Sequence, residues 1–233
     1  MSRVVGTGLW PVRLSAAPSQ EEDGPQCRGY SRPTVADAVP NSADNPIALF
    51  QTWFAEAIAF GMKEPSAMTV ATVDADGYPD ARMMLLKGVD DRGFVFYTNL
   101  GSAKARALMR DPRAALCFYW LEIGKQVRVR GRANMVGDEE ADAYFATRPR
   151  LSRISAWASK QSQPMRSYFE FEAKVARAAL RFGVGEIPRP PFWSGFCVAP
   201  ERLEFWLQKP FRRHQRIVYE RVPDGWRKQW LYP

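Results

Sequence analysis

The sequence GSAK at residues 101–104 has the residue types of an anion-binding helix start. It follows an apolar stretch at residues 94–97 and opens a segment with helical character at residues 103–109. Free backbone N–H groups and the helix dipole at such a start favour a phosphate, and Arg82 and Lys87 add positive charge nearby. We interpret it as a phosphate site. The alternative is an N-capped helix with solvated cations, because a lone Gly-Ser-x-Lys pattern is weakly specific.

A second candidate is the sequence RRHQR at residues 212–216, which contains the only histidine of the chain. If this stretch is extended, side chains alternate and Arg212, His214 and Arg216 share one face. Two guanidinium groups beside one imidazole repel each other unless an anion lies between them. We therefore interpret the triplet as a ligand site, with a structural histidine as the alternative.

A third candidate is a dense group of cations and serines at residues 148–164, arranged around Trp157. Its members are Arg148, Arg150, Arg153, Lys160, Ser152, Ser155, Ser159 and Ser162. This density of anion-binding donors favours a second phosphate site, with a solvated face as the alternative. On the alternating strand at residues 125–132, Gln126 is a neutral amide that could bond the ring edge of a ligand.

The elements that would position these side chains are mostly short strands. We expect strands at residues 67–73, 83–86, 94–97, 114–120, 125–132, 193–198, 203–206, 215–220 and 226–232. The continuous apolar run at residues 83–86 is typical of a strand buried on both faces. Helices are expected from residues 46, 103, 138 and 167, the first capped by Asn45 with a following proline. Successive hairpins indicate a mainly β fold with helices (α+β), an antiparallel barrel or meander.

Composition divides the chain into a flexible arm at residues 1–44 and one domain at residues 45–233. The arm is rich in Gly, Pro, Ser, Asp and Asn and has no sustained periodicity. Its first residues contain arginine and serine without acids, so the presence of a transit peptide stays open. Pro11 and Arg13 interrupt the only apolar patch, which makes a poor secretory signal.

The charge of the 233-residue chain is +8 at pH 7, which favours small anionic partners. Cations and acids are interspersed, so we expect no nucleic-acid partner. The three cysteines fit neither a metal site nor a disulfide framework, which favours the cytoplasm and no metal. No apolar run approaches the ~18 residues of a membrane span, so we expect no membrane partner.

Seven motifs in order give the chain a resemblance to a known family, from about residue 47 to residue 233. They are RMMLLKG, FVFYTNLGSAKA, KQVRVRG, YFATRPRLSRISAWASKQS, FWSGF, LEFW and RRHQR. The ordered set resembles the pyridoxine/pyridoxamine 5′-phosphate oxidase family. The resemblance implies an FMN-binding antiparallel split β-barrel that forms a homodimer with FMN in the dimer interface.

The same resemblance implies two groups of site residues. The cofactor-binding group is Arg82, Met83, Leu85, Leu86, Lys87, Tyr97, Thr98, Ser102, Lys104, Gln126, Gln161, Ser162, Trp206 and Arg216. The substrate-binding group is Lys87, Tyr144, Arg148, Ser152, Arg212 and His214, of which Arg212 and His214 are also the expected catalytic residues. Glu64 stands where the family commonly has an acid, and Arg28 and Tyr30 loosely match its N-terminal lid motif.

The implied activity is FMN-dependent oxidation of pyridoxine and pyridoxamine 5′-phosphates to pyridoxal 5′-phosphate. O₂ would be the electron acceptor and yield H₂O₂, with ammonia released from the amine; the protein would bind and orient the cofactor and substrate. Three alternatives stay open: a phenazine-type flavin oxidase, an NAD(P)H-dependent flavin reductase and a non-catalytic FMN or B6-phosphate carrier. The preference between amine and alcohol is also open.

Three positions depart from the family pattern. Ala103 stands where the family often has arginine, which removes one possible phosphate contact. The family's usual R-L-H-D-R is R-R-H-Q-R here, and Leu207-Gln208 replaces a usual Gln-Gly. By alternation Arg213 and Gln215 would point away from the site, so these changes would leave its residues in place.

Overall fold

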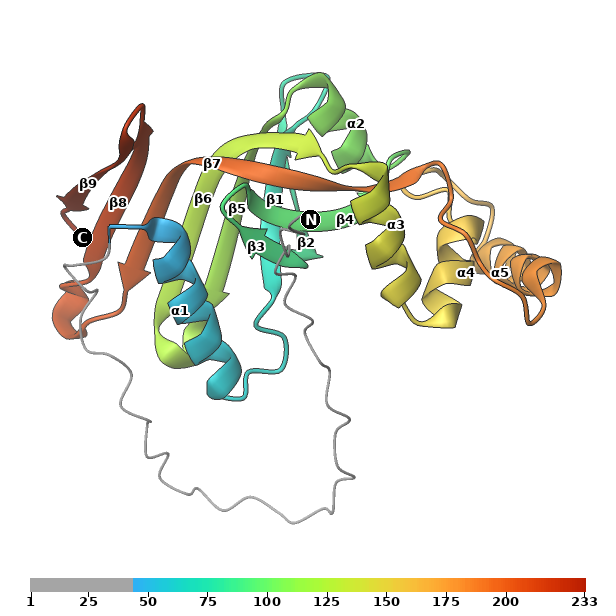
Figure 1. Cartoon of the computed structure of the whole chain (residues 1–233), viewed down its shortest axis with the longest axis horizontal. Coiled ribbons are helices and arrows are strands. Elements are labelled where there is room, and N and C mark those ends of the chain that lie inside the picture. Colours follow the sequence, from blue (N-terminus) through green and yellow to red (C-terminus); the bar gives the residue numbers. More distant parts are fainter. Residues whose placement is uncertain (1–43) are drawn as a thin grey trace, which may run out of the picture.

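The computed structural model describes residues 44–233. The predicted arm, with Arg28 and Tyr30, therefore lies almost wholly outside the described residues, and the domain boundary stays a prediction. The elements, drawn in Figure 1, are α1 (Pro46–Ala59), β1 (Ala67–Val73), β2 (Pro79–Leu85), β3 (Gly88–Asp90), β4 (Gly93–Asn99), α2 (Ala103–Arg110), β5 (Arg113–Trp120), η1 (Leu121–Ile123), β6 (Lys125–Met135), α3 (Asp138–Thr147), α4 (Arg150–Ala158), α5 (Tyr168–Phe182), β7 (Trp193–Leu207), η2 (Pro210–Arg212), β8 (Gln215–Val222) and β9 (Gly225–Leu231).

The strands form one curled antiparallel sheet in the order β2-β1-β5-β6-β7-β4-β3, with β8 and β9 added beside β7. Figure 1 shows α3, α4 and α5 at one end of this sheet and β8 and β9 at the other. The expected antiparallel split β-barrel with helices is confirmed. Among the helices of residues 44–233, none has both the length and the apolarity needed to cross a membrane.

Helix α1 begins where the sequence predicts it. The Asn45 side chain accepts hydrogen bonds from the backbone N–H of Ile47 at 2.9 Å and of Ala48 at 3.4 Å, with proline at the first helical position. The apolar face of the helix lies against the inner face of the sheet. Phe50 packs edge-on against two strand rings at 4.8 Å, so burial of this face fixes the helix to the core.

Strand β2 corrects one expectation. The run at residues 83–86 is not buried on both faces, because β2 pairs only with β1 and forms an edge of the sheet. Met83 is 63% exposed and Leu85 36%, whereas Leu86, just past the strand, is in the core. Met83 and Leu85 thus face outward in a single chain, as at a surface that another molecule covers, whereas Met84 between them packs against the core.

Strand β7 corrects a second expectation from the sequence. The two strands expected at residues 193–198 and 203–206 are one continuous strand, which pairs with β6 over almost its whole length. Its first part also pairs with β4 and its second part with β8. Continuity depends on Gly131 of β6, where a Cβ would lie 2.0 Å from the carbonyl oxygen of Ala199. Only glycine permits this close approach beside Pro200.

Helix α3, at the end of the sheet opposite β8 and β9, is held by the side chain of Arg189. Arg189 donates to Asp142 at 2.6 Å and Asp138 at 2.7 Å, both on α3, and to the carbonyl of Trp193 at 2.8 Å. These bonds attach α3 to the start of β7. The cation- and serine-rich segment at residues 148–164 forms helix α4 and the turn after it, and α4 packs against α5.

Candidate functional site

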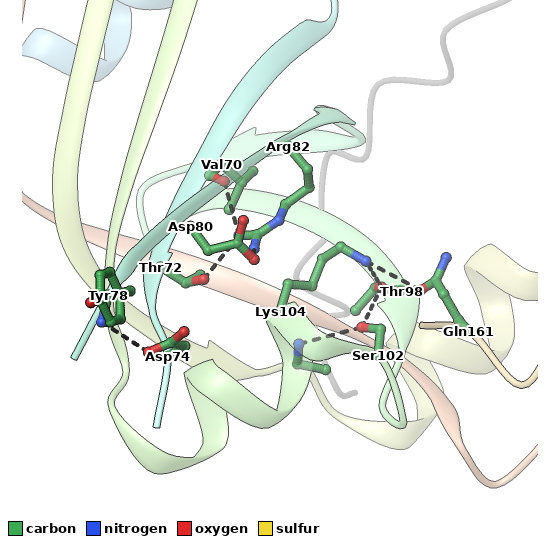
Figure 2. Close-up of polar contacts among 11 residues, drawn as sticks. Val70, Thr72, Asp74, Tyr78, Asp80, Arg82, Thr98, Ser102, Lys104 and Gln161 are labelled. Carbon is green, nitrogen blue, oxygen red and sulfur yellow. Dashed lines mark hydrogen bonds and ion pairs between the residues drawn. The ribbon is translucent and has the colours of Figure 1, made fainter. Parts of the chain in front are cut away.

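The predicted anion site at residues 101–104 is a buried polar cluster, shown in Figure 2. The Lys104 ammonium donates to Thr98 Oγ1 and Gln161 Oε1, each at 3.2 Å. Ser102 caps α2 by accepting from the backbone N–H of Ala105 at 3.4 Å. Strand β4, helix α2 and the turn after α4 therefore bring together side chains about 60 residues apart in the chain.

Lys104 is buried without a counter-ion. Its side chain forms no ion pair within residues 44–233, and only 8% of the residue is exposed. Burial lowers the pKa of its ammonium, and nearby Arg82 lowers it further, while Asp80 opposes both. Arg82 itself is fixed by Asp80, by Thr72 at 2.9 Å and by the Val70 carbonyl at 3.1 Å. The cluster is therefore short of negative charge.

A group of three aromatic rings supports a second cation, the half-buried Arg148. The ring of Tyr97 has its centroid 4.0 Å from that of Tyr144 and 5.3 Å from that of Trp193, the latter two are 6.2 Å apart, and all three planes are near-parallel. The Arg148 guanidinium packs over the Trp193 ring at 4.9 Å. Its buried Nη1 has no hydrogen-bond partner within the described chain, and burial lowers its pKa. An unpaired buried guanidinium nitrogen is costly unless a ligand occupies the space beside it.

Four of the six expected substrate residues lie near these rings: Lys87, Tyr144, Arg148 and Ser152. The pKa of Lys87 is lowered by burial first and by Arg148 last, with Glu64 opposing, so these three charges are close together. Ser152 and Arg148 line a cavity of about 420 Å³, and Tyr97, Thr98 and Gln161 line it too. Arg148 therefore lines the cavity directly, and Lys104 is next to it through its hydrogen bonds to Thr98 and Gln161. We call Lys87, Lys104 and Arg148 the cation pocket.

Three of the remaining cofactor candidates lie on the neighbouring strands β6, β7 and β8. Gln126, Trp206 and Arg216 are paired across β6, β7 and β8 and form one row. The His214 ring packs on Trp206 at 4.6 Å, and its Nδ1 accepts from the backbone N–H of Lys209 at 3.2 Å. None of these residues lines the cavity.

The expected strand at residues 215–220 begins at Gln215 as predicted, but the extended chain that the alternation argument assumed does not reach residue 212. Pro210 starts a short 3₁₀ turn, and Phe211 and Arg212 have positive φ of 56° and 58°. Alternation therefore cannot place Arg212 on the face of His214 and Arg216. Arg212 and Arg213 are both exposed.

Three other candidates are exposed and belong neither to the cation pocket nor to the row of Gln126, Trp206 and Arg216. Met83 and Leu85 are on the exposed face of β2, and Ser162 lies in the turn beside Gln161, also exposed. Two polar residues with several contacts in these regions were missed by sequence reasoning. Asn99 joins two candidate segments by donating to the Ser159 carbonyl at 2.9 Å and accepting from Gly101 N–H at 2.8 Å. Glu204 lies in a strand whose pattern indicates plain alternation, and only the structure shows that it accepts hydrogen bonds from Arg128 and Arg216 on the two neighbouring strands.

Two family models match the chain. The model described as pyridoxamine 5′-phosphate oxidase matches residues 54–182, and the model described as pyridoxine 5′-phosphate oxidase C-terminal dimerisation region matches residues 193–233. A pyridoxine/pyridoxamine 5′-phosphate oxidase of Azorhizobium caulinodans is 56% identical, over 82% of this chain and 92% of the relative. One of Caulobacter vibrioides is 48% identical, over 96% of this chain and 98% of the relative.

Solved structures give the same fold. PhzG from Burkholderia lata, in complex with tetrahydrophenazine-1-carboxylic acid, has a TM-score of 0.79 at 30% identity, over 83% of this chain and 95% of that one. An FMN-binding protein from Nostoc punctiforme has a TM-score of 0.64 at 18% identity, over 79% of this chain and 97% of that one, which bears on the fold alone. The matched models span most of the described residues, and the chain belongs to the pyridoxamine 5′-phosphate oxidase family.

Proposed function

We propose that this protein oxidises pyridoxine 5′-phosphate and pyridoxamine 5′-phosphate to pyridoxal 5′-phosphate with FMN as cofactor. O₂ accepts the electrons and yields H₂O₂, and the amine substrate also releases ammonia. The observation that carries the proposal is the cavity of about 420 Å³ beside two cations, the buried Lys104 and the half-buried Arg148, that form no ion pair within residues 44–233. Two phosphate-bearing ligands, cofactor and substrate, account for two such cations.

The residues around Lys104 fit the phosphate of FMN. Phosphate oxygens are strong acceptors that would replace the neutral oxygens of Thr98 and Gln161 as partners of the ammonium. Ser102 and the start of α2 add a hydroxyl and backbone N–H donors. One phosphate site with no dinucleotide-binding glycine motif favours FMN over FAD. We expect flavin released by denaturation to run as FMN on chromatography, and mostly FAD would contradict this.

The substrate phosphate is assigned to Lys87, Tyr144, Arg148 and Ser152. The ring stack holds Arg148 so that its unpaired Nη1 needs little rearrangement to bind an oxyanion. When bound, FMN supplies the two-electron chemistry at the substrate carbon that bears the alcohol or amine. His214 accepts at Nδ1, so its neutral ring carries the proton on Nε2 and can donate to the ligand. Arg212 orients the substrate's pyridine end.

Assembly completes the site in this proposal. The family model of residues 193–233 is described as a dimerisation region, and β2 exposes apolar residues to solvent in the single chain. A second copy would bring its row of Gln126, Trp206 and Arg216 to the cation pocket. Light scattering at micromolar protein should give twice the 26.5 kDa chain mass. A fully active monomer would refute the shared site.

The test of function is peroxide release by flavin-loaded protein with each B6 phosphate, together with the appearance of the aldehyde product. Pyridoxine without phosphate is the control, and it should be oxidised far less efficiently because the unpaired cations need an anion. Anaerobic mixing with NADH or NADPH tests the flavin reductase alternative. Flavin reduction by a nicotinamide and not by either B6 phosphate would overturn the proposal, and binding without turnover would favour a carrier.

The phenazine-type alternative has one observation in its favour, the fold shared with PhzG at 30% identity. The pyridoxine/pyridoxamine 5′-phosphate oxidases are more similar, at 48–56% identity. The half-buried Arg148 and Lys87 also suit a compact dianion. A phenazine carboxylic acid offered in the same peroxide assay should therefore be a poor substrate.

A further inference from the structure

Glu204 of β7 is a buried carboxylate on the outward face of the sheet. Only 7% of its side chain is exposed, although it lies on the same face as exposed arginines. Its Oε1 accepts from Arg216 Nη2 at 2.7 Å and Nε at 3.0 Å, and its Oε2 accepts from Arg128 Nη1 at 3.3 Å. Arg202 Nη2 lies 4.0 Å from Oε2. We call Glu204, Arg128, Arg202 and Arg216 the Glu204 network.

The network lies directly beside the row of Gln126, Trp206 and Arg216. Arg128 pairs with Glu204 across β6 and β7, one step of alternation from the pair of Gln126 with Trp206. Side chains two residues apart in a strand share a face, so Glu204 and Trp206 point to the same side. Arg216 pairs with Trp206 across β7 and β8 and reaches diagonally to Glu204.

The contacts of Arg216 leave its guanidinium fixed but not saturated. An arginine has five N–H donors in a planar fork. Three are used within the described chain: Nε and one on Nη2 for Glu204, and one on Nη1 for the Tyr232 carbonyl at 3.1 Å. One N–H on each terminal nitrogen stays available in a set direction. This is the arrangement of a preorganised donor pair.

We propose that Glu204 is a positioning residue for the cofactor, acting through Arg216. This inference rests on the proposed function, in which Arg216 binds FMN. The carboxylate accepts two N–H groups of Arg216 at Oε1, and its charge keeps the other two guanidinium groups from repelling Arg216. Three guanidinium groups around a single carboxylate still carry net positive charge, so the region stays attractive to an anionic cofactor. Without the carboxylate, Arg216 would lose two of its three bonds and turn toward solvent.

The experiment compares Glu204→Gln with Glu220→Gln. Glu220 is the matched control, because it lies on the neighbouring strand and pairs with Arg202 and Arg227 without contacting Arg216. FMN dissociation constants of the apoproteins are measured by quenching of flavin fluorescence. Loss of a charged hydrogen-bonded pair should weaken FMN about tenfold or more in Glu204→Gln. In Glu220→Gln the constant should change less than about twofold.

A double-mutant cycle separates positioning from a general effect on the fold. Arg216→Ala should weaken FMN, and adding Glu204→Gln to it should have little further effect, because the carboxylate then has no Arg216 to hold. The same loss in both backgrounds would make Glu204 merely structural and overturn the inference. If Glu204→Gln does not fold, Glu204→Asp, which retracts the carboxylate, is put through the same cycle.

The outcomes also separate this inference from the proposed function. Weakening by Arg216→Ala with no effect of Glu204→Gln overturns the positioning role and leaves the cofactor assignment intact. Tight FMN binding in Arg216→Ala overturns both the assignment of Arg216 and the role of Glu204. Absence of FMN binding by the unaltered protein removes the proposed function itself.

Discussion

The cation pocket and the Glu204 network differ in how their positive charges are balanced. In the network a buried carboxylate accompanies the guanidinium groups, with N···O distances from 2.7 to 4.0 Å. In the cation pocket the positive groups have no ion pair within residues 44–233, and burial lowers their pKa values. The cost of leaving those charges unpaired suggests that ligands complete the pocket. In the network the carboxylate has its ion-pair partners within residues 44–233, which suits a role in holding the Arg216 side chain.

The largest expected effect concerns Arg212 and Arg213, the exposed pair in the turn before β8. Arg212→Ala should lower kcat/KM by roughly a hundredfold or more, because Arg212 is proposed to orient the reacting end of the substrate. Arg213→Ala should stay within about threefold. Steady-state kinetics on FMN-saturated variants measure both. A greater loss for Arg213→Ala would show that the turn presents the other arginine, and the assignment of Arg212 would fail.

The next prediction tests whether the Lys104 ammonium binds the phosphate of FMN. Lys104→Met should weaken FMN by roughly ten- to a hundredfold, since a charge-assisted bond to phosphate is lost. Riboflavin, which lacks the phosphate, serves as the control, and its affinity should change little. Fluorescence quenching with each flavin gives the two constants. Equal losses for FMN and riboflavin would mean that Lys104 supports the fold of the site rather than the phosphate.

The apoprotein offers a second check on Lys104. Its folded-state pKa is lowered from the usual 10.5, so between the folded pKa and 10.5 the unfolded chain binds more protons. The stability of the unaltered apoprotein therefore rises with pH across that window. Lys104→Met removes this contribution, so its advantage in unfolding free energy should shrink as pH rises. Urea titrations at several pH values measure it, and a pH-independent difference would contradict an unpaired ammonium.

The smallest expected effect comes from Ala103. Ala103→Arg should tighten FMN by up to about tenfold, because an exposed charged contact contributes less than a buried one. Arg106 limits the gain, since its guanidinium already donates to the Gly101 carbonyl beside the site. Titration of apoprotein with FMN decides the point, with Ala103→Gln as a neutral control. An unchanged constant would indicate that Arg106 already serves the phosphate.

Sequence reasoning succeeded where a local rule governs the structure. The Asn45 cap, the start of α2 at Ala103 and the alternation of β6 each depend on neighbouring residues only, and each is confirmed. It failed where pairing with a strand distant in the sequence determines the local structure. Pro200 ends an apolar pattern, yet β7 continues because Gly131 on another strand makes room for it.

The candidate site shows the same division. Residue types and the family resemblance identified Lys104 and Arg148, but nothing local indicates that both adjoin one cavity. The alternation argument for Arg212 failed because Phe211 and Arg212 take positive φ, which sequence rules assign mainly to glycine. Glu204 was missed since its burial comes from arginines on two other strands.

The long strand β7 has a consequence for how the protein reaches its native state. Its first residues pair with β4, about a hundred residues earlier in the chain, and the same strand also pairs with β6 and β8. Such distant pairing carries a large loop-closure entropy before any contact compensates it. The cation pocket needs β4 and Trp193 in place, so it forms only after this closure. We therefore expect cofactor binding late in refolding, with flavin quenching slower than the gain of helical signal.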